Sequence, residues 1–320
     1  MEAYSDDKVI LNYQNAGAGR EEMNRVRSKI HADKAHQAGY TGRGITAAVL
    51  DTGICLHPDY RDRIVLFRDF VNGERECYDD ASHGSHVSGI LGGDGRCLNG
   101  KYRGIAPECR IIHLKVLDRF GRGKVEHLLA GINWVIENRE TYKIRIMNIS
   151  AGASREDQES IRLVNAVERA WDAGLTVVVA AGNMGPGEGT VTVPGNSRKV
   201  ITVGSSDDFR SRCGSGKAAY SGQGPTSSCV CKPELVAPGT GIVSCAASWQ
   251  KSGYYQVKSG TSMAAPVVSG CVALLFSAAP GLTNVEAKME LKKACVDLGL
   301  PFNRQGWGMP DLEILLRLGK

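Results

Sequence analysis

Three positions in this chain carry the residue types that covalent catalysis by a hydroxyl group requires. Asp51 follows the apolar run at 45–50, His83 lies near a second histidine, His86, and Ser262 precedes a long apolar segment. A serine hydroxyl is a weak nucleophile until a base accepts its proton, and a histidine serves as that base when a carboxylate fixes its tautomer. An aspartate, a histidine and a serine brought together could therefore catalyse acyl transfer.

Each of these residues also has a purely structural interpretation. An aspartate before Thr-Gly is typical of a turn, and a serine before an apolar helix is typical of an N-cap. Asn183 follows the small residues 180–182 and could donate a hydrogen bond into a cleft, but asparagine is also a common turn residue. Backbone N–H groups at the start of the helix after Gly260 would stabilise an oxyanion beside Ser262. Taken one at a time, the motifs leave both interpretations open.

Metal-binding alternatives are weaker. A zinc-peptidase helix has two histidines four positions apart with a glutamate between them, whereas His83 and His86 are three apart and enclose a glycine and a serine. Cys229 and Cys231 flank one valine, but no second pair of cysteines or histidines accompanies them, so we interpret them as structural thiols. We expect the chain's ten cysteines to be free thiols in a reducing cytosol.

The elements that must position these residues follow an α/β pattern. Short β-branched runs alternate with longer amphipathic segments, which indicates a parallel sheet whose strands are connected by helices. Helices are predicted at 124–139 and 158–173, and two further helices are predicted to start near His83 and near Ser262. Another is predicted from a cap at Thr283 to about residue 294. Six strands are predicted, several almost wholly apolar because both their faces are covered: 45–50, 64–67, 110–117, 144–149, 175–180 and 200–203.

Composition and charge are those of a globular protein without a polyanionic partner. Hydrophobic residues make up 42% of the 320 positions, and the net charge of +5 is spread without a run of like charges, so we expect neither nucleic acid nor membrane as a partner. Residues 1–20 lack the apolar core of a signal peptide, which favours a cytoplasmic location. The apolar stretch 263–279 falls short of the roughly 20 residues that span a bilayer, so we expect a buried helix.

Four segments occur in one order along the chain, namely AAVLDTGI, SHGSHVSGI, AAGN and SGTSMAAP. They resemble the motifs of the subtilisin-like (S8) serine peptidases nearly letter for letter, and the resemblance extends from about Ile30 to Val296. It implies a subtilisin-like three-layer α/β fold with a mostly parallel central sheet and helices on both faces. It also implies a serine endopeptidase of broad specificity that hydrolyses proteins and peptides through an acyl-enzyme on Ser262, without a cofactor for the chemistry.

Within this resemblance, each catalytic role is assigned to one residue. Asp51 matches the orienting carboxylate, His83 the general base and Ser262 the nucleophile, while His86 matches a non-catalytic neighbour. Asn183 matches the side chain that donates to the tetrahedral oxyanion together with the Ser262 N–H. The order Asp, His, Ser and the oxyanion-binding asparagine are those of subtilisin itself, so these roles come from the resemblance and not from spacing.

The resemblance also implies that a peptide substrate binds as an added β-strand. The peptide would lie antiparallel beside 150–152, with 121–123 on its other side. Thr192 aligns with a position that is usually glycine at the floor of the specificity pocket, which implies a shallower pocket and a preference for medium-sized apolar side chains. The residues assigned to substrate binding are Ser150, Ala151, Gly152, Gly123, Ala181, Gly182 and Thr192.

Two departures from the family pattern lead to further expectations. The segment 92–102 replaces a loop that often binds calcium, which leaves Asp59 as a candidate ligand of a structural calcium ion that needs six to eight oxygens. Residues 1–25 form an extension too short for a folded propeptide, without evident strand or helix pattern, and 26–320 form the catalytic domain. We expect an intracellular-type subtilisin whose extension is an inhibitory leader that covers the cleft until it is cleaved.

Two other classes of function remain as alternatives. One is a non-catalytic relative that acts as a peptide-binding scaffold or regulator, although such proteins usually lack a triad residue and this chain has all three. The other is a metallopeptidase using His83 and His86, which the spacing disfavours.

Overall fold

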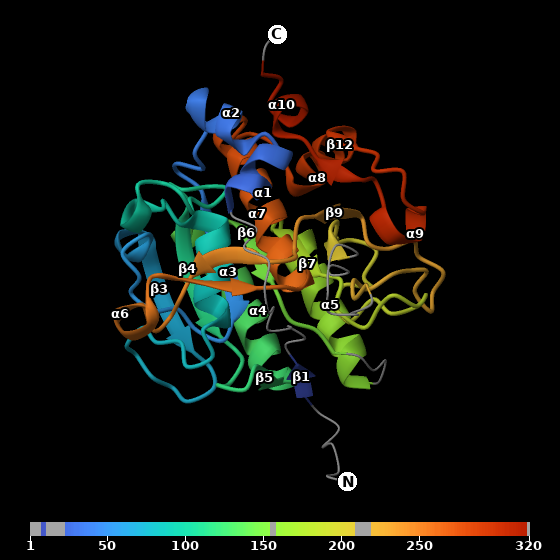
Figure 1. Cartoon of the computed structure of the whole chain (residues 1–320). Coiled ribbons are helices and arrows are strands. Elements are labelled where there is room, and N and C mark those ends of the chain that lie inside the picture. The colour runs from blue at the N-terminus through green and yellow to red at the C-terminus, as the bar shows by residue number, and fades with distance from the viewer. Residues whose placement is uncertain (1–7, 11–22, 154–157, 209–218, 319–320) are drawn as a thin grey trace.

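A seven-stranded sheet forms the centre of the protein (Figure 1). The computed structural model describes residues 8–10, 23–153, 158–208 and 219–318. The strand order is β3-β4-β2-β6-β7-β8-β9, and all neighbouring strands are parallel. The strands are β2 (Thr46–Asp51), β3 (Ile64–Asp69), β4 (Arg110–Lys115), β6 (Ile144–Ile149), β7 (Thr176–Ala180), β8 (Ile201–Ser205) and β9 (Leu235–Ala237).

Helices connect and cover these strands. The α-helices are α1 (Met23–Lys29), α2 (Ala32–Gln37), α3 (His83–Gly92), α4 (Val125–Tyr142), α5 (Gln158–Asp172), α6 (Trp249–Ser252), α7 (Thr261–Ala278), α8 (Asn284–Lys293), α9 (Phe302–Gln305) and α10 (Leu312–Leu315). Two 3₁₀ turns are η1 (Arg61–Arg63) and η2 (Arg96–Leu98). α3 contacts α7, which crosses β6, β7, β8 and β9, whereas α4 contacts α5 and lies against β2 and β6. The predicted three-layer α/β architecture is confirmed.

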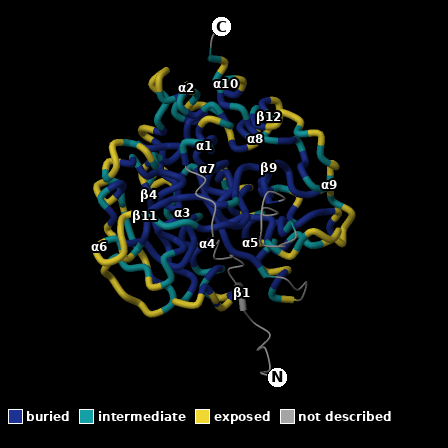
Figure 2. The backbone as a smooth tube through the Cα atoms, in the orientation of Figure 1, coloured by how far each residue is buried: buried dark blue, intermediate teal, exposed yellow. Residues whose placement is uncertain are grey.

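The core lies between the sheet and its helices, and Figure 2 shows these interior elements as buried. All six residues of β2 and all five of β7 are buried, as expected for strands covered on both faces. The six predicted strands correspond to β2, β3, β4, β6, β7 and β8, with ends that differ by up to two residues. The seventh strand, β9, was not predicted because it has only three residues and lies between Pro233 and Pro238.

Helix α7 is the apolar stretch that we expected to be buried. In the described part of the chain it is the one helix long and apolar enough to cross a membrane, and most of that window is buried inside the protein. A core helix explains its composition, because it has apolar neighbours on all sides. The predicted cap of α8 is also confirmed, since the Thr283 side chain accepts from the Glu286 N–H in a capping box.

Three short antiparallel pairs complete the structure. β10 (Ile242–Cys245) pairs with β11 (Tyr255–Lys258), and β12 (Cys295–Val296) pairs with β13 (Met309–Pro310). β1 (Lys8–Ile10) pairs with β5 (Arg122–Lys124), placing Val9 opposite Gly123. We expected no strand in the first 25 residues, and β1 corrects that expectation. Its three residues pair with the edge of β5, and pairing with an existing strand does not require an alternating sequence pattern of their own.

Candidate active site

Asp51 and His83 form a buried pair at the carboxyl edge of the sheet. Asp51 is the last residue of β2, and His83 is the first residue of α3. The His83 Nδ1–H donates to Asp51 Oδ1 over 2.7 Å, and both side chains are fully buried. Because a carboxylate can only accept, this bond assigns the proton of the neutral imidazole to Nδ1 and leaves Nε2 as the basic nitrogen. The structure therefore brings these two predicted residues together.

A set of residues that sequence reasoning missed holds the loop after Asp51. The Thr52 N–H donates to Asp51 Oδ1 over 2.7 Å, and Thr52 Oγ1 donates to Asp79 Oδ1 over 2.8 Å. Thr52 Oγ1 also accepts from the Gly84 N–H over 2.9 Å, which ties the loop to the first turn of α3. The fully buried Lys115 on β4 donates to the Thr52 carbonyl. In the sequence, the position of Asp79 four residues before His83 was the one feature that could have indicated this supporting set.

Two further histidines near the pair are structural. His86 Nε2 donates to the Ile242 carbonyl over 3.0 Å, and burial lowers the pKa of His86 well below its ordinary value. His113 on β4 was missed as a site residue; its Nε2 accepts from the Gly53 N–H over 3.2 Å, and burial lowers its pKa to about 3. Because His83 and His86 bond to different partners, the geometry disagrees with a zinc-peptidase site.

Ser262 is tied to the end of β6 by a chain of buried hydrogen bonds. Its hydroxyl donates to the Ser150 carbonyl over 2.9 Å, and the Ser150 hydroxyl donates to the Ser262 carbonyl over 3.1 Å. Asn148 Nδ2 donates to Ser150 Oγ, and Ser269 Oγ donates to Asn148 Oδ1, both over 2.9 Å. These bonds hold the first turn of α7 against the carboxyl edge of the sheet.

Asn183 lies beside the start of α7 with a defined amide orientation. The Thr261 N–H lies 2.9 Å from Asn183 Oδ1, and Thr261 Oγ1 lies 3.1 Å from the same oxygen. A backbone N–H can only donate, so the atom facing it must be the oxygen of the amide and Nδ2 must be on the other branch. Since Asn183 and Ser262 line one pocket, Nδ2 and the N–H of Ser262 in the first helical turn can serve one anion.

This pocket contains most of the residues predicted to bind substrate. It encloses about 200 Å³, part of it open to solvent, and is lined by Ser150, Ala151, Gly152, Ala180, Gly182, Asn183, Thr192, Thr261 and Ser262. The Thr192 side chain lies between two glycines. A Cβ atom on Gly152 would come within 2.5 Å of Thr192 Oγ1, and one on Gly182 within 2.4 Å of Thr192 Cγ2. Thr192 therefore fills space between two backbone segments of the pocket.

Two predicted substrate-binding residues lie outside this pocket. Ala181 is fully buried, and its carbonyl accepts from the Thr192 N–H over 2.9 Å, so it supports the pocket from behind. Gly123 lies on β5, where its strand partner is Val9 of β1. The structure thus places the chain's own β1 along one of the two segments expected to flank a substrate.

Asp59, the candidate calcium ligand, is surrounded by hydrogen-bond donors. It accepts from the Cys97 N–H over 3.1 Å and from the Tyr255 hydroxyl over 2.7 Å. The nearest other side chains that could bind a cation are His57 and Cys97, which offer nitrogen and sulfur. Calcium requires six to eight oxygen ligands. The described residues around Asp59 therefore do not fit calcium.

Comparison with known proteins agrees with this fold. The family model described as "Subtilase family" (Peptidase_S8) matches residues 42–308. The chain is 42% identical over 282 residues to Serine protease AprX of Bacillus subtilis, covering 82% of this chain and 64% of AprX. It is 32% identical over 290 residues to Subtilisin Savinase of Lederbergia lenta, covering 91% of this chain and 97% of that protein.

A solved structure gives the same result. A cold adapted subtilisin-like serine proteinase superposes with a TM-score of 0.67 at 29% identity, covering 85% of this chain and 88% of the other. The chain belongs to the subtilase family of peptidases. It spans 64% of the length of AprX and 43% of the length of the Minor extracellular protease Epr of Bacillus subtilis, to which it is 34% identical.

Proposed function

We propose that this chain is a subtilisin-like serine endopeptidase in which Asp51, His83 and Ser262 form the catalytic triad. The observation that carries the proposal is the 2.7 Å bond from His83 Nδ1–H to Asp51, which is fully buried, while Ser262 lies in the first turn of α7. The bond orients the imidazole and provides a buried anion for the imidazolium that forms during the reaction. The triad has all its members, which a peptide-binding scaffold would not need.

The catalytic cycle uses the side chains in sequence. The Ser262 hydroxyl, which donates to the Ser150 carbonyl, turns about its Cα–Cβ bond toward His83 Nε2. As Ser262 Oγ attacks the substrate carbonyl carbon, its proton passes to Nε2, and the carbonyl oxygen becomes an anion. Collapse of this intermediate breaks the peptide C–N bond, and Nε2 returns the proton to the leaving amine. Water then hydrolyses the acyl-enzyme by the same steps.

The tetrahedral anion is stabilised by two donors of different origin. One is Asn183 Nδ2, which is directed away from Thr261 by the bonds to Asn183 Oδ1. The other is the Ser262 N–H, which has no helical carbonyl four residues before it because α7 begins at Thr261. Both donors are positioned before the substrate arrives, so they require little reorganisation when charge develops on the oxygen.

Substrates are proteins and peptides that bind as a β-strand. Ser150, Ala151 and Gly152 offer an edge with Ser262 at its end, and the pocket closed by Thr192 accepts the side chain before the cleaved bond. Because Thr192 narrows the pocket and none of the described residues that line it is acidic, we expect medium-sized apolar side chains there. Main-chain bonding accepts many sequences, which gives broad specificity.

The N-terminal extension, residues 1–25, acts as an inhibitory leader of the catalytic domain 26–320. The support for this role is the pairing of Lys8–Ile10 with Arg122–Lys124, because a strand on β5 takes hydrogen-bonding positions that a substrate would use. A cytoplasmic location is supported by the nine cysteines of the described ranges, which are all free thiols.

One pair of variants tests the catalytic proposal. Wild-type chain should hydrolyse casein and be inactivated by a serine-directed sulfonyl fluoride that labels Ser262, while Ser262→Ala should lose both hydrolysis and labelling. Asn183→Ala should keep the labelling site but reduce kcat by the factor of about 10²–10³ known for this asparagine in subtilisin itself. Hydrolysis that survives in Ser262→Ala, or that chelators alone abolish, would contradict the triad.

A further inference from the structure

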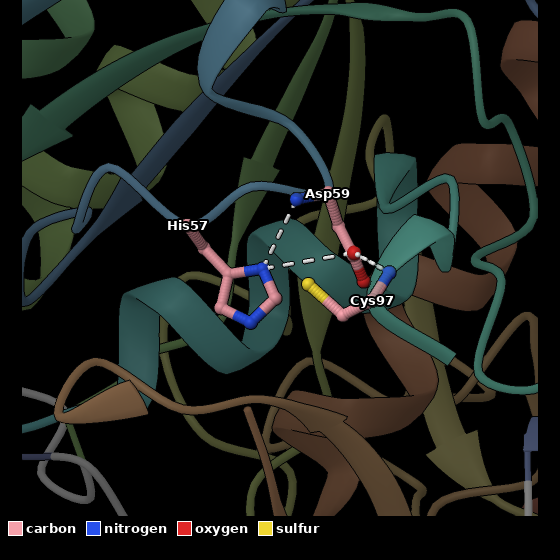
Figure 3. A group of neighbouring side chains, drawn as sticks. All are labelled: His57, Asp59 and Cys97. Carbon is pink, nitrogen blue, oxygen red and sulfur yellow. Dashed lines mark hydrogen bonds and ion pairs between the residues drawn. The ribbon is translucent and has the colours of Figure 1, made fainter. Parts of the chain in front are cut away.

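A second cluster of reactive side chains lies away from the triad. His57 and Asp59 lie in the loop after β2, and Cys97 lies on the 3₁₀ turn η2. Segments about forty positions apart in the sequence therefore meet here (Figure 3). One ring nitrogen of His57, an Asp59 carboxylate oxygen and Cys97 Sγ all lie within 4.8 Å of one another. His57 and Asp59 are fully buried, whereas Cys97 is half-buried.

The hydrogen bonds of His57 leave its unprotonated nitrogen, Nδ1, directed at the cluster. Nε2 lies 2.9 Å from the Tyr254 carbonyl, which can only accept, so Nε2 carries the proton. Nδ1 then has a lone pair, which accepts from the Asp59 N–H over 3.2 Å and lies 4.0 Å from Asp59 Oδ1. A neutral histidine whose other nitrogen donates to a backbone carbonyl is the usual form of a metal ligand.

The two carboxylate oxygens of Asp59 have different surroundings. Oδ2 accepts from the Tyr255 hydroxyl over 2.7 Å and from the Cys245 thiol over 3.8 Å. Oδ1 accepts from the Cys97 N–H over 3.1 Å and faces His57 Nδ1. A carboxylate oxygen has two lone pairs, so Oδ1 has one left for a cation once the Cys97 thiol, which also hydrogen-bonds to Asp59, has lost its proton.

We propose that His57 Nδ1, Asp59 Oδ1 and Cys97 Sγ bind a zinc ion. Nitrogen, carboxylate oxygen and thiolate sulfur are the ligands that zinc prefers, at about 2.0–2.3 Å, which places them roughly 3.3–3.6 Å apart around a tetrahedral ion. Because the ligand atoms are separated by up to 4.8 Å, the cluster needs a contraction of up to about 1.5 Å to reach that geometry. On binding, the Cys97 thiol releases one proton to solvent and the Asp59 N–H loses its bond to Nδ1. Water occupies the fourth position.

The role of the site is structural. Tyr60, Trp249, Tyr254 and Tyr255 surround the His57 ring at centroid distances of 5.6–6.0 Å, which limits access of water to the cluster. The ion would strengthen the link between the loop after β2 and η2, which the bond from the Cys97 N–H to Asp59 already joins. It would therefore stabilise the folded chain by the affinity of the folded state for zinc. The proposal does not depend on the peptidase activity.

The test uses the full chain with Ser262→Ala, which prevents self-digestion, kept reduced by a non-thiol reductant. Cobalt(II) added to this protein should bind at one ion per chain and give a thiolate-to-cobalt absorption band that zinc removes. Zinc should raise Tm by about 5 °C or more at concentrations well above Kd, and EDTA should reverse the rise. Calcium should produce neither effect.

Matched cysteine variants locate the site. Cys97→Ser keeps the backbone donor to Asp59 and should lose the cobalt band, with zinc affinity reduced by more than the ~10–100-fold that loss of an outer partner costs. Cys295→Ser is the control, because that thiol is also half-buried and donates to the Leu291 carbonyl, which a serine can do. It should retain the band and the affinity.

A further variant separates metal binding from folding. Cys97→Asp should bind zinc without the thiolate band, because a carboxylate replaces the sulfur ligand. The proposal is overturned if cobalt gives no thiolate band with the parent, if Cys97→Ser and Cys295→Ser bind zinc equally well, or if calcium rather than zinc raises Tm.

Discussion

Thr192 illustrates how one side chain can determine the shape of the proposed substrate pocket. It lies between Gly152 and Gly182, and its methyl and hydroxyl groups occupy the space that a larger substrate side chain would need. We expect Thr192→Gly to raise the ratio of kcat/KM for phenylalanine over alanine before the cleaved bond by about tenfold or more, since apolar contacts of this size are worth about 1–3 kcal/mol. Cleavage rates on a matched peptide series measure this ratio.

The control for this variant is Thr190→Gly, which makes the same chemical change at a position that does not line the pocket. It should leave the ratio unchanged. An unchanged ratio in Thr192→Gly, or a maximum at arginine in the parent enzyme, would contradict the assigned pocket.

The sequence indicated the proposed catalytic residues but not the residues that support them. Asp51 and Ser262 stand in motifs that became informative only together, because four such segments occur in one order along the chain. Thr52 and Lys115 support the site through contacts that exist only once β2 and β4 are paired. A lysine at the end of an apolar strand has no pattern that distinguishes a buried cation from an exposed one, so its role could not be predicted.

Among the elements, β1 gives the most direct prediction. We expect removal of residues 1–22 to raise the initial rate of peptide hydrolysis about tenfold or more, which corresponds to ~1.4 kcal/mol or more of competition by the leader. The cut keeps Arg25, whose guanidinium lies 2.7 Å from Asp207. Progress curves of intact and shortened chains measure the effect, and the intact chain should show a lag.

Two observations check this interpretation. A synthetic peptide of residues 1–22, added to the shortened chain, should restore inhibition in competition with substrate. Mass spectrometry of the fully active enzyme should show a new N-terminus. A fully active form that retains Met1 would show that the leader does not inhibit.

The central strands and long helices were predicted because each has its own pattern, whereas the short pairs were not. β2 and β7 have polar residues only at their ends, four of the six residues of β6 are apolar, and α5 has apolar residues at helical spacing. β1, β5 and β9 have three residues each, and they are strands because they pair with a neighbouring strand. Tertiary context decides such segments, and sequence periodicity cannot.

At the scale of the whole molecule, His113 links stability to pH. Burial lowers its pKa from 6.5 to about 3 in the folded chain. Between those values the unfolded chain binds a proton that the folded chain does not, so the free energy of unfolding falls as pH decreases below 6.5. Between pH 7 and pH 5 we expect the free energy of unfolding of the parent to fall by about 2 kcal/mol more than that of His113→Gln. Urea unfolding of both chains with Ser262→Ala measures the difference, and equal losses would contradict it.

The order of the proposed catalytic groups along the chain has a consequence for synthesis. Asp51 and His83 leave the ribosome first, while Ser262 belongs to α7, which packs on the strands from β6 to β9. A nascent chain that ends before α7 lacks both its nucleophile and the helix that completes the core. A translation product that ends before α7 should therefore lack the proposed peptidase activity, which can arise only after this helix has been synthesised.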